Sequence, residues 1–142
     1  MFIVRYMEVK IMEISSDIKT LFGHTYDVPA GIPAVFDSLE KQFGNFDGYH
    51  LYGVTACEGD KLIYRACLAS ATGSGTNPYN LPDYYIPKGK YLYIILKDWR
   101  NHLKEIAGLF DKMMMIDEAK KDTICLEDYR SEDEMLLMVQ HK

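Results

Sequence analysis

The apolar residues of the chain follow two different periods. Strand-forming residue types, with apolar residues on alternate positions, predict strands over 7–14, 18–26, 49–56, 61–69 and 91–96, and a strand-turn-strand hairpin over 124–140. Apolar residues three and four positions apart predict two helices. The two helical stripes are Ile32, Val35, Phe36, Leu39 and Phe43, and Trp99, Leu103, Ile106, Phe110 and Met113.

Local signals mark where some of these elements begin and end. Pro33 suits the first turn of the first helix, and Gly44-Asn45 is expected to end it. Asp98 is expected to cap the N-terminus of the second helix. Gly23, inside the second strand, predicts a bulge or the close approach of another backbone.

The predicted elements occur in an order that repeats. Two strands, a helix and two strands are followed by a connector over 70–80 and then by a strand, a helix and two strands. We therefore expect a single domain over 1–142, with related halves at about 7–69 and 81–140. The predicted fold class is α+β, with duplicated β-α-β-β units forming one antiparallel sheet. Two helices would cover one face of this sheet, and a ligand groove would lie on the other.

Composition and charge exclude several classes of protein. A chain of 142 residues with 48% hydrophobic and 26% charged residues is expected to form one globular domain with a proper core. A net charge of -5 without a cluster of Lys and Arg argues against a nucleic-acid surface. No apolar run is long enough for a signal peptide or a membrane span. The cysteines form no CxxC pair, which suits a reducing compartment, so we expect a cytoplasmic protein.

Glu127 is the most informative single residue because it lies inside a predicted strand near the C-terminus. Alternate strand residues share a face, so Glu127 and Tyr129 point to one side. Ile124 and Leu126 point to the other side, and if they face a core, Glu127 projects from the opposite face. Two interpretations stay open for Glu127. It is either a solvated charge on an outward face or a carboxylate beside a tyrosine over a binding cleft.

Three short motifs and the order of the elements together resemble a known family. Tyr52-Gly53 lies in a strand after the first helix, Ile86-Pro-Lys-Gly-Lys-Tyr91 introduces a later strand, and Leu126-Glu-Asp-Tyr129 is similar to a Phe-Glu-x-Tyr pattern. With the element order over 7–140, these features resemble the GyrI-like small-molecule-binding domain. This domain is also called the AraC-type or bacterial transcription activator effector-binding domain.

The resemblance implies a groove between the two halves, with aromatic walls and one inward glutamate, that binds hydrophobic and often cationic compounds. By motif position, that glutamate is Glu127. The predicted walls are Tyr129, Tyr91 and Tyr52 by motif position, and Tyr64 and Trp99 by their facing and placement.

Elementary chemistry agrees with such a site. A desolvated carboxylate is costly to keep charged, so a cationic ligand that supplies a partner gains free energy. Aromatic faces add cation-π attraction of about 0.5 to 2 kcal/mol each. A site of this kind would select ligands by charge and flatness, and would accept a broad range of compounds.

The resemblance leaves several functions open. No helix-turn-helix segment precedes the first strand, so we expect a free-standing protein that senses or sequesters a lipophilic compound, in a role linked to transcription regulation or to drug or toxin response. One alternative is an enzyme that hydrolyses strained alkylating compounds with Glu127 and Tyr129. Another is a protein inhibitor of gyrase type, which would contact its partner through the acidic turn Glu132-Asp133-Glu134.

The sequence gives no reason to expect a metal or a cofactor. The four histidines, His24, His50, His102 and His141, have no ligand-like spacing. The glycine-rich stretch in 70–80 lacks the Gly-Lys-Ser/Thr of a phosphate-binding loop. A small lipophilic molecule is thus the expected partner, a protein partner stays possible in principle, and the oligomeric state stays open.

Overall fold

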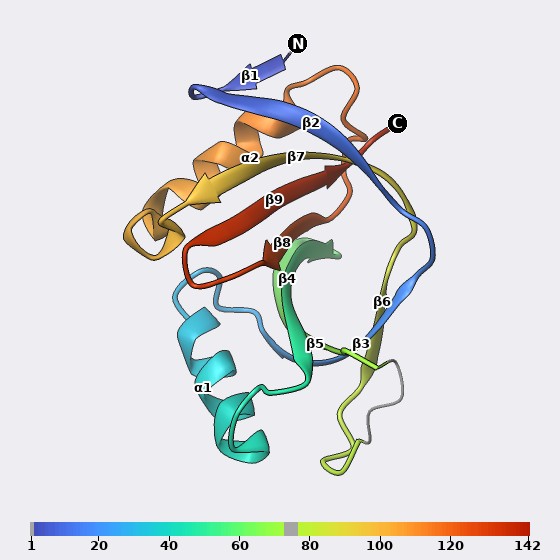
Figure 1. Ribbon diagram of the computed structural model, residues 1–142, viewed down its shortest axis with the longest axis vertical. Helices are drawn as coiled ribbons and strands as arrows, with labels where there is room; N and C mark the ends of the chain where they lie inside the picture. The colour runs from blue at the N-terminus through green and yellow to red at the C-terminus, as the bar shows by residue number, and fades with distance from the viewer. Residues whose placement is uncertain (1, 73–76) are drawn as a thin grey trace. The chain divides into compact units, whose positions relative to one another are not determined.

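The computed structural model describes residues 2–72 and 77–142, which form nine strands, two α-helices and two short 3-10 helices (Figure 1). These elements fall into two compact units. The first unit contains Met1–Ser16 and Lys88–Lys142, and the second contains Asp17–Pro87. The predicted connector 70–80 lies partly outside the described residues, because 73–76 are not among them.

The first unit is an antiparallel sheet with one helix. Its strands run in the order β1-β2-β7-β9-β8, and each neighbouring pair is antiparallel. The elements are β1 (Phe2–Val4), β2 (Met7–Ile14), β7 (Gly89–Lys97), the 3-10 helices Trp99–Asn101 and Leu103–Glu105, α2 (Ile106–Met114), β8 (Cys125–Tyr129) and β9 (Glu134–Gln140).

The core of the first unit lies between α2 and one face of this sheet. Leu92, Ile94 and Leu96 of β7 lie on that face because alternate strand residues point the same way. The buried cluster contains Val4, Val9, Leu92, Ile94, Leu96, Leu109, Phe110, Met113, Ala119, Met135, Leu137 and Val139. Tyr91 on the opposite face of β7 is also buried, so the strand is sheltered on both faces at this position.

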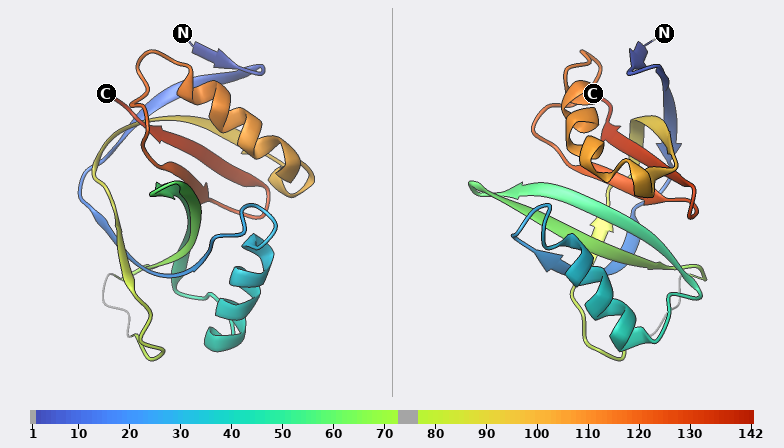
Figure 2. Two further views of the ribbon diagram at one scale, coloured as in Figure 1. Left: turned by 180° about the vertical axis from the view of Figure 1, so that it is seen from behind. Right: turned by 90° about the vertical axis from the view of Figure 1, so that its left-hand side faces the viewer.

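The second unit is also an antiparallel sheet with one α-helix, but it has four strands where the first unit has five. Its strands run in the order β4-β5-β3-β6, again antiparallel throughout. The elements are β3 (Ile18–Thr25), α1 (Ile32–Phe43), β4 (Tyr49–Glu58), β5 (Lys61–Ser70) and β6 (Asp83–Ile86). Figure 2 shows from two further sides that α1 lies along the strands of this unit.

The ends of α1 follow from its sequence. Pro33 lies in the first turn of α1. Backbone N–H groups in a first turn have no acceptor within the helix, so the N–H that proline lacks costs no helical hydrogen bond. Gly44 follows the last residue with a φ of 79°, a left-handed conformation that glycine adopts without a steric penalty, and its N–H donates to the Glu40 carbonyl. The apolar stripe buries Leu39 against Tyr64 and Ala66 of β5. The prediction for this helix is confirmed at both ends.

The predicted fold class is confirmed: the chain is α+β, with antiparallel strands and one helix in each of two related arrangements. The compact units nevertheless differ from the sequence halves 7–69 and 81–140, because the first strands are exchanged. β2 pairs with β7, with Ile11 opposite Leu92, while β3 pairs with β6, with Thr20 opposite Tyr84. Each sequence half therefore contributes a strand to the unit of the other half.

The prediction that Asp98 caps the second helix was wrong. Asp98 has a φ of 53° and makes no capping hydrogen bond; its carboxylate instead accepts from the Asn101 side chain at 2.9 and 3.1 Å. Its N–H donates to the Asp133 carbonyl at 2.6 Å, which ties the end of β7 to the β8–β9 turn. Two 3-10 turns follow, and α2 begins only at Ile106.

The strands β1 and β6 were not predicted. They are short and lie at the end of the strand order in their own units. A strand of three or four residues is too brief to display a period of two. No helix within residues 2–72 and 77–142 is long and apolar enough to cross a membrane.

Candidate functional site

Glu127 occupies the middle of β8 on the face that α2 covers. It lies directly opposite Leu137 of β9, which lies opposite Ile94 of β7, and both of these residues belong to the core cluster. Cys125 and Tyr129, on the same face of β8, pack against that cluster. Only 7% of Glu127 is exposed, so the interpretation as a solvated charge was wrong. The prediction that Leu126 points the other way holds, although the face of Glu127 is itself a core face.

The sequence prediction that Glu127 and Tyr129 share a face of the strand is confirmed by a hydrogen bond. The Tyr129 hydroxyl donates to Glu127 Oε1 at 3.0 Å. The two residues are two apart on a strand, which brings their side chains to the same side of the sheet. A hydrogen bond to an ionised carboxylate stabilises the charged form and partly offsets the cost of burying it.

Trp99 joins this pair from the 3-10 segment after β7. Its ring lies 5.3 Å from the Tyr129 ring, centroid to centroid, at an interplanar angle of 80°, an edge-to-face arrangement that aromatic pairs favour. Its indole N–H donates to the Ser131 carbonyl at 3.0 Å, which fixes the ring against the β8–β9 turn. Both rings are half-buried, so each retains some accessible surface. The structure thus brings together Glu127, Tyr129 and Trp99.

A second buried carboxylate next to Glu127 was not predicted. Asp128 is 5% exposed and lies opposite Leu136, on the other face of the strand. Its Oδ2 accepts from Arg130 Nε at 2.9 Å. An aspartate and an arginine two residues apart on a strand share a face, so their spacing in the sequence was a signal for this ion pair.

Tyr91 does not lie beside Glu127. Tyr91 pairs with Gln140 of β9, whereas Glu127 pairs with Leu137, and the odd separation of these partners puts the two side chains on opposite faces of the sheet. Tyr91 is also fully buried. Its predicted place in a ligand wall stays a prediction.

Tyr52 and Tyr64 belong to the second unit and lie on opposite faces of its sheet. Tyr64 is fully buried beneath α1, with its ring 6.3 Å from that of Phe36. Tyr52 lies opposite Cys67, and its ring is 4.7 Å from the His50 ring. The two tyrosines therefore do not form a common surface, and their role as wall residues stays a prediction.

The cluster of Glu127, Tyr129 and Trp99 combines one carboxyl group with two aromatic rings. Such a set can hold a cation by charge and by its ring faces. A cation already uses this chemistry, since the Arg100 guanidinium lies 5.1 Å from the centre of the Trp99 ring. Among the residues that the structure describes, no group of three or more His, Cys, Asp or Glu is placed to hold a metal ion.

Comparison with known proteins gives structural likeness without sequence likeness. No family model matches the chain, and no curated protein matches it. An integron cassette protein from the mobile metagenome of Vibrio cholerae is 15% identical, with a TM-score of 0.66 over 94% of this chain and 95% of that one. A protein named SAV2435, solved bound to tetraphenylphosphonium, is 13% identical, with a TM-score of 0.65 over 96% and 94%.

A Staphylococcus aureus protein, provisionally described as a bacterial transcription regulation protein, is likewise 13% identical. Its TM-score is 0.61 over 94% of this chain and 99% of that one. At such low identity these likenesses show that the chain shares the fold of these proteins over nearly its whole length.

Proposed function

We propose that this chain binds lipophilic cations around Glu127, as a GyrI-like effector-binding protein in a sensing or sequestering role. The observation that carries the proposal is a buried carboxylate on an apolar strand face that accepts a 3.0 Å hydrogen bond from the hydroxyl of Tyr129, whose ring packs against Trp99. The fold adds support, because a neighbour of the same fold was solved with tetraphenylphosphonium.

The physical reason is the poor hydration of the Glu127 carboxylate. A charge out of water costs several kcal/mol unless partners replace the lost hydration, and an oppositely charged ligand is one such partner. A lipophilic cation supplies the opposite charge and loses little hydration of its own on binding. Tyr129 and Trp99 would contribute cation-π attraction and apolar contact.

The proposal depends less on the other predicted wall residues. The role of Tyr52, Tyr64 and Tyr91 in ligand binding stays a prediction that rests on the resemblance to the family. Tyr129 and Trp99 come first because the Tyr129 hydroxyl donates to Glu127 and the Tyr129 ring contacts that of Trp99.

The test is a titration with tetraphenylphosphonium that follows the fluorescence of Trp99, the only tryptophan of the chain. We expect saturable binding to the wild type and at least tenfold weaker binding to Glu127→Gln, which corresponds to about 1.4 kcal/mol. Glutamine keeps the size of the side chain and still accepts the Tyr129 hydrogen bond, so the loss reports on charge. Calorimetry of the same pair would check the affinity without an optical signal.

Two controls make this experiment decisive. Glu13→Gln removes an exposed carboxylate from β2 of the same unit and should leave the affinity unchanged. Tetraphenylborate has nearly the shape of tetraphenylphosphonium with the opposite charge and should not bind. The proposal fails if the borate binds as tightly as the phosphonium, or if Glu127→Gln binds like the wild type.

A second candidate function is hydrolysis of strained alkylating compounds at the same place. The 3.0 Å contact between the Tyr129 hydroxyl and Glu127 Oε1 favours it, because a carboxylate that acts on water needs a positioned proton donor or acceptor nearby. Such an enzyme would consume the compound, and both Glu127→Gln and Tyr129→Phe would abolish the consumption. Mass spectrometry of the product separates this activity from binding alone.

A further inference from the structure

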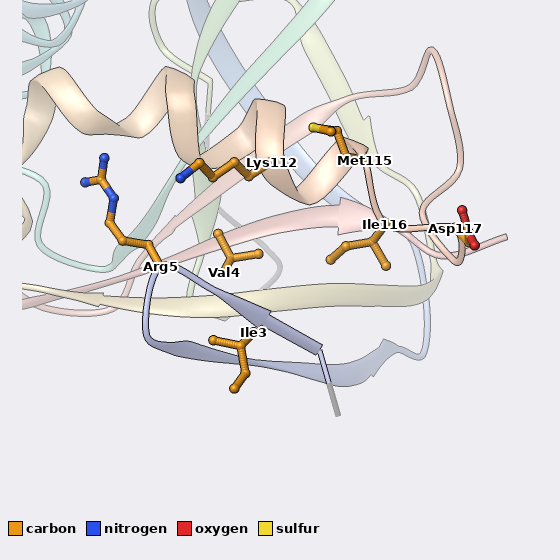
Figure 3. A pocket seen from close by; sticks show the side chains of 7 residues that line it. All are labelled: Ile3, Val4, Arg5, Lys112, Met115, Ile116 and Asp117. Carbon is orange, nitrogen blue, oxygen red and sulfur yellow. The ribbon is translucent and has the colours of Figure 1, made fainter.

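The first unit contains a cavity that is separate from the residues around Glu127. It lies between β1 with its following turn and the C-terminal end of α2 (Figure 3). Its volume is about 490 Å³, within the range of roughly 300 to 1,000 Å³ that is usual for small-molecule sites. The lining residues are Ile3, Val4, Arg5, Lys112, Met115, Ile116 and Asp117.

The middle of this cavity is apolar and partly open to solvent. Val4 is buried, whereas Ile3 is 63% and Met115 is 79% exposed. Large apolar side chains that gather around a hollow at the surface are typical of binding sites, because each of them gains free energy when a ligand covers it.

The charged residues are divided between the two ends of the cavity. Arg5 and Lys112 extend toward one end, and Asp117 lies at the other, with Val4 and Ile116 between them (Figure 3). The Arg5 guanidinium forms an ion pair with Glu105 through Nη1. A guanidinium group carries five N–H donors, so Arg5 can also donate to a second acceptor. Arg5 and Lys112 each carry a positive charge, and Glu105 carries one negative charge. This end of the cavity is therefore positive.

We propose that this cavity binds a small aliphatic monocarboxylate. Its carboxylate would lie against Arg5 and Lys112, since guanidinium and ammonium groups pair with carboxylates through charge-assisted hydrogen bonds. Its chain would cover Val4, Met115 and Ile116. Asp117 sets the orientation of the bound ligand, because its carboxylate repels a second carboxylate at the far end of the cavity. The site is thus distinct in place and in ligand charge from the proposed cation site at Glu127.

The experiment is an NMR titration of the full chain with octanoate, which follows the backbone amides. We expect saturable shifts confined to residues 3–5 and 112–117, and weaker binding at high salt because exposed charges are screened. Suberate, which has the same chain length with a carboxylate at both ends, should bind several-fold more weakly, and octylammonium should not cause these shifts. Shifts that centre elsewhere, or equal binding of octylammonium, would overturn the proposal.

Substitutions identify the charged end of the site. Lys112→Gln is expected to weaken octanoate binding about threefold, as for loss of one exposed ion pair, and Lys112→Glu about tenfold. The matched control is Lys41→Gln, because Lys41 occupies the last turn of α1 as Lys112 occupies the last turn of α2. Met115→Ser should also weaken binding, and since Met115 is exposed, the fold should tolerate it. Equal affinity of all four variants for octanoate would refute the site.

Discussion

At the scale of single residues, burial decides the chemistry of Glu127. The side chain is placed on a face with Leu137 and Ile94 by strand register, and a carboxylate among such neighbours is far more costly than one in water. The Tyr129 hydroxyl is its neighbour by alternation along the strand. A residue type that usually lies at the surface therefore becomes the best candidate for a binding role.

The cysteines provide a prediction at the same scale. Burial raises the pKa of the Cys67 thiol to about 12, against the smaller opposing effects of the Thr20 hydrogen bond and the Arg65 charge. The thiolate is the reactive form, so a raised pKa leaves very little of it at pH 8. Cys57 is exposed. We expect iodoacetamide at pH 8 to label Cys57 quickly and Cys67 only in denaturant, as measured by peptide mass spectrometry. Equal labelling rates in the native protein would contradict this.

At the scale of elements, the signals in the local sequence were reliable where backbone conformation alone determines where an element ends. Both ends of α1 follow the sequence signals, since glycine takes up left-handed conformations and proline restricts φ. The start of α2 was predicted wrongly, because the N–H of Asp98 is held by the β8–β9 turn, far along the chain. The sequence around Asp98 does not contain that partner.

Gly23 and Gly108 should respond in opposite ways to a side chain. A Cβ at Gly23 would meet Val35 Cγ1 of α1 at 3.2 Å and Leu39 Cδ2 at 3.4 Å, so side chains of α1 approach this glycine, and not another backbone as predicted. Gly23→Leu should therefore destabilise the protein by about 1 to 3 kcal/mol. Gly108 lies in α2 with open space around it, so Gly108→Ala should stabilise by about 0.5 to 1 kcal/mol. Urea denaturation measures both, and a change of the same sign would contradict this interpretation.

At the scale of the whole molecule, the chain builds one of its two compact units from segments that are distant in sequence. β1 and β2 begin the chain but belong to the core of the unit that contains α2, through Val4 and Val9. The second unit is continuous in sequence and has its own buried cluster around Leu39 and Tyr64. We therefore expect each unit to have its own stability against unfolding.

The stability of each unit can be measured by hydrogen exchange. Val9→Ala should cost about 2 kcal/mol and reduce amide protection in β7 and β9 more than in β5, because Val9 packs in the first unit. Leu39→Ala should reduce protection in β5 more than in β9. An equal loss in all three strands for both variants would mean that the units unfold as one.

The amino-acid sequence by itself determined the periods of the strands and helices, the ends of α1, the hairpin near the C-terminus and the shared face of Glu127 and Tyr129. These features depend on residues close together in the chain, where backbone geometry dictates the result. Only the tertiary structure decided that β2 pairs with β7, that Trp99 lies against Tyr129 and that the face of Glu127 is buried. Each of these depends on which apolar surfaces fit together between distant segments, and a local pattern does not contain that information.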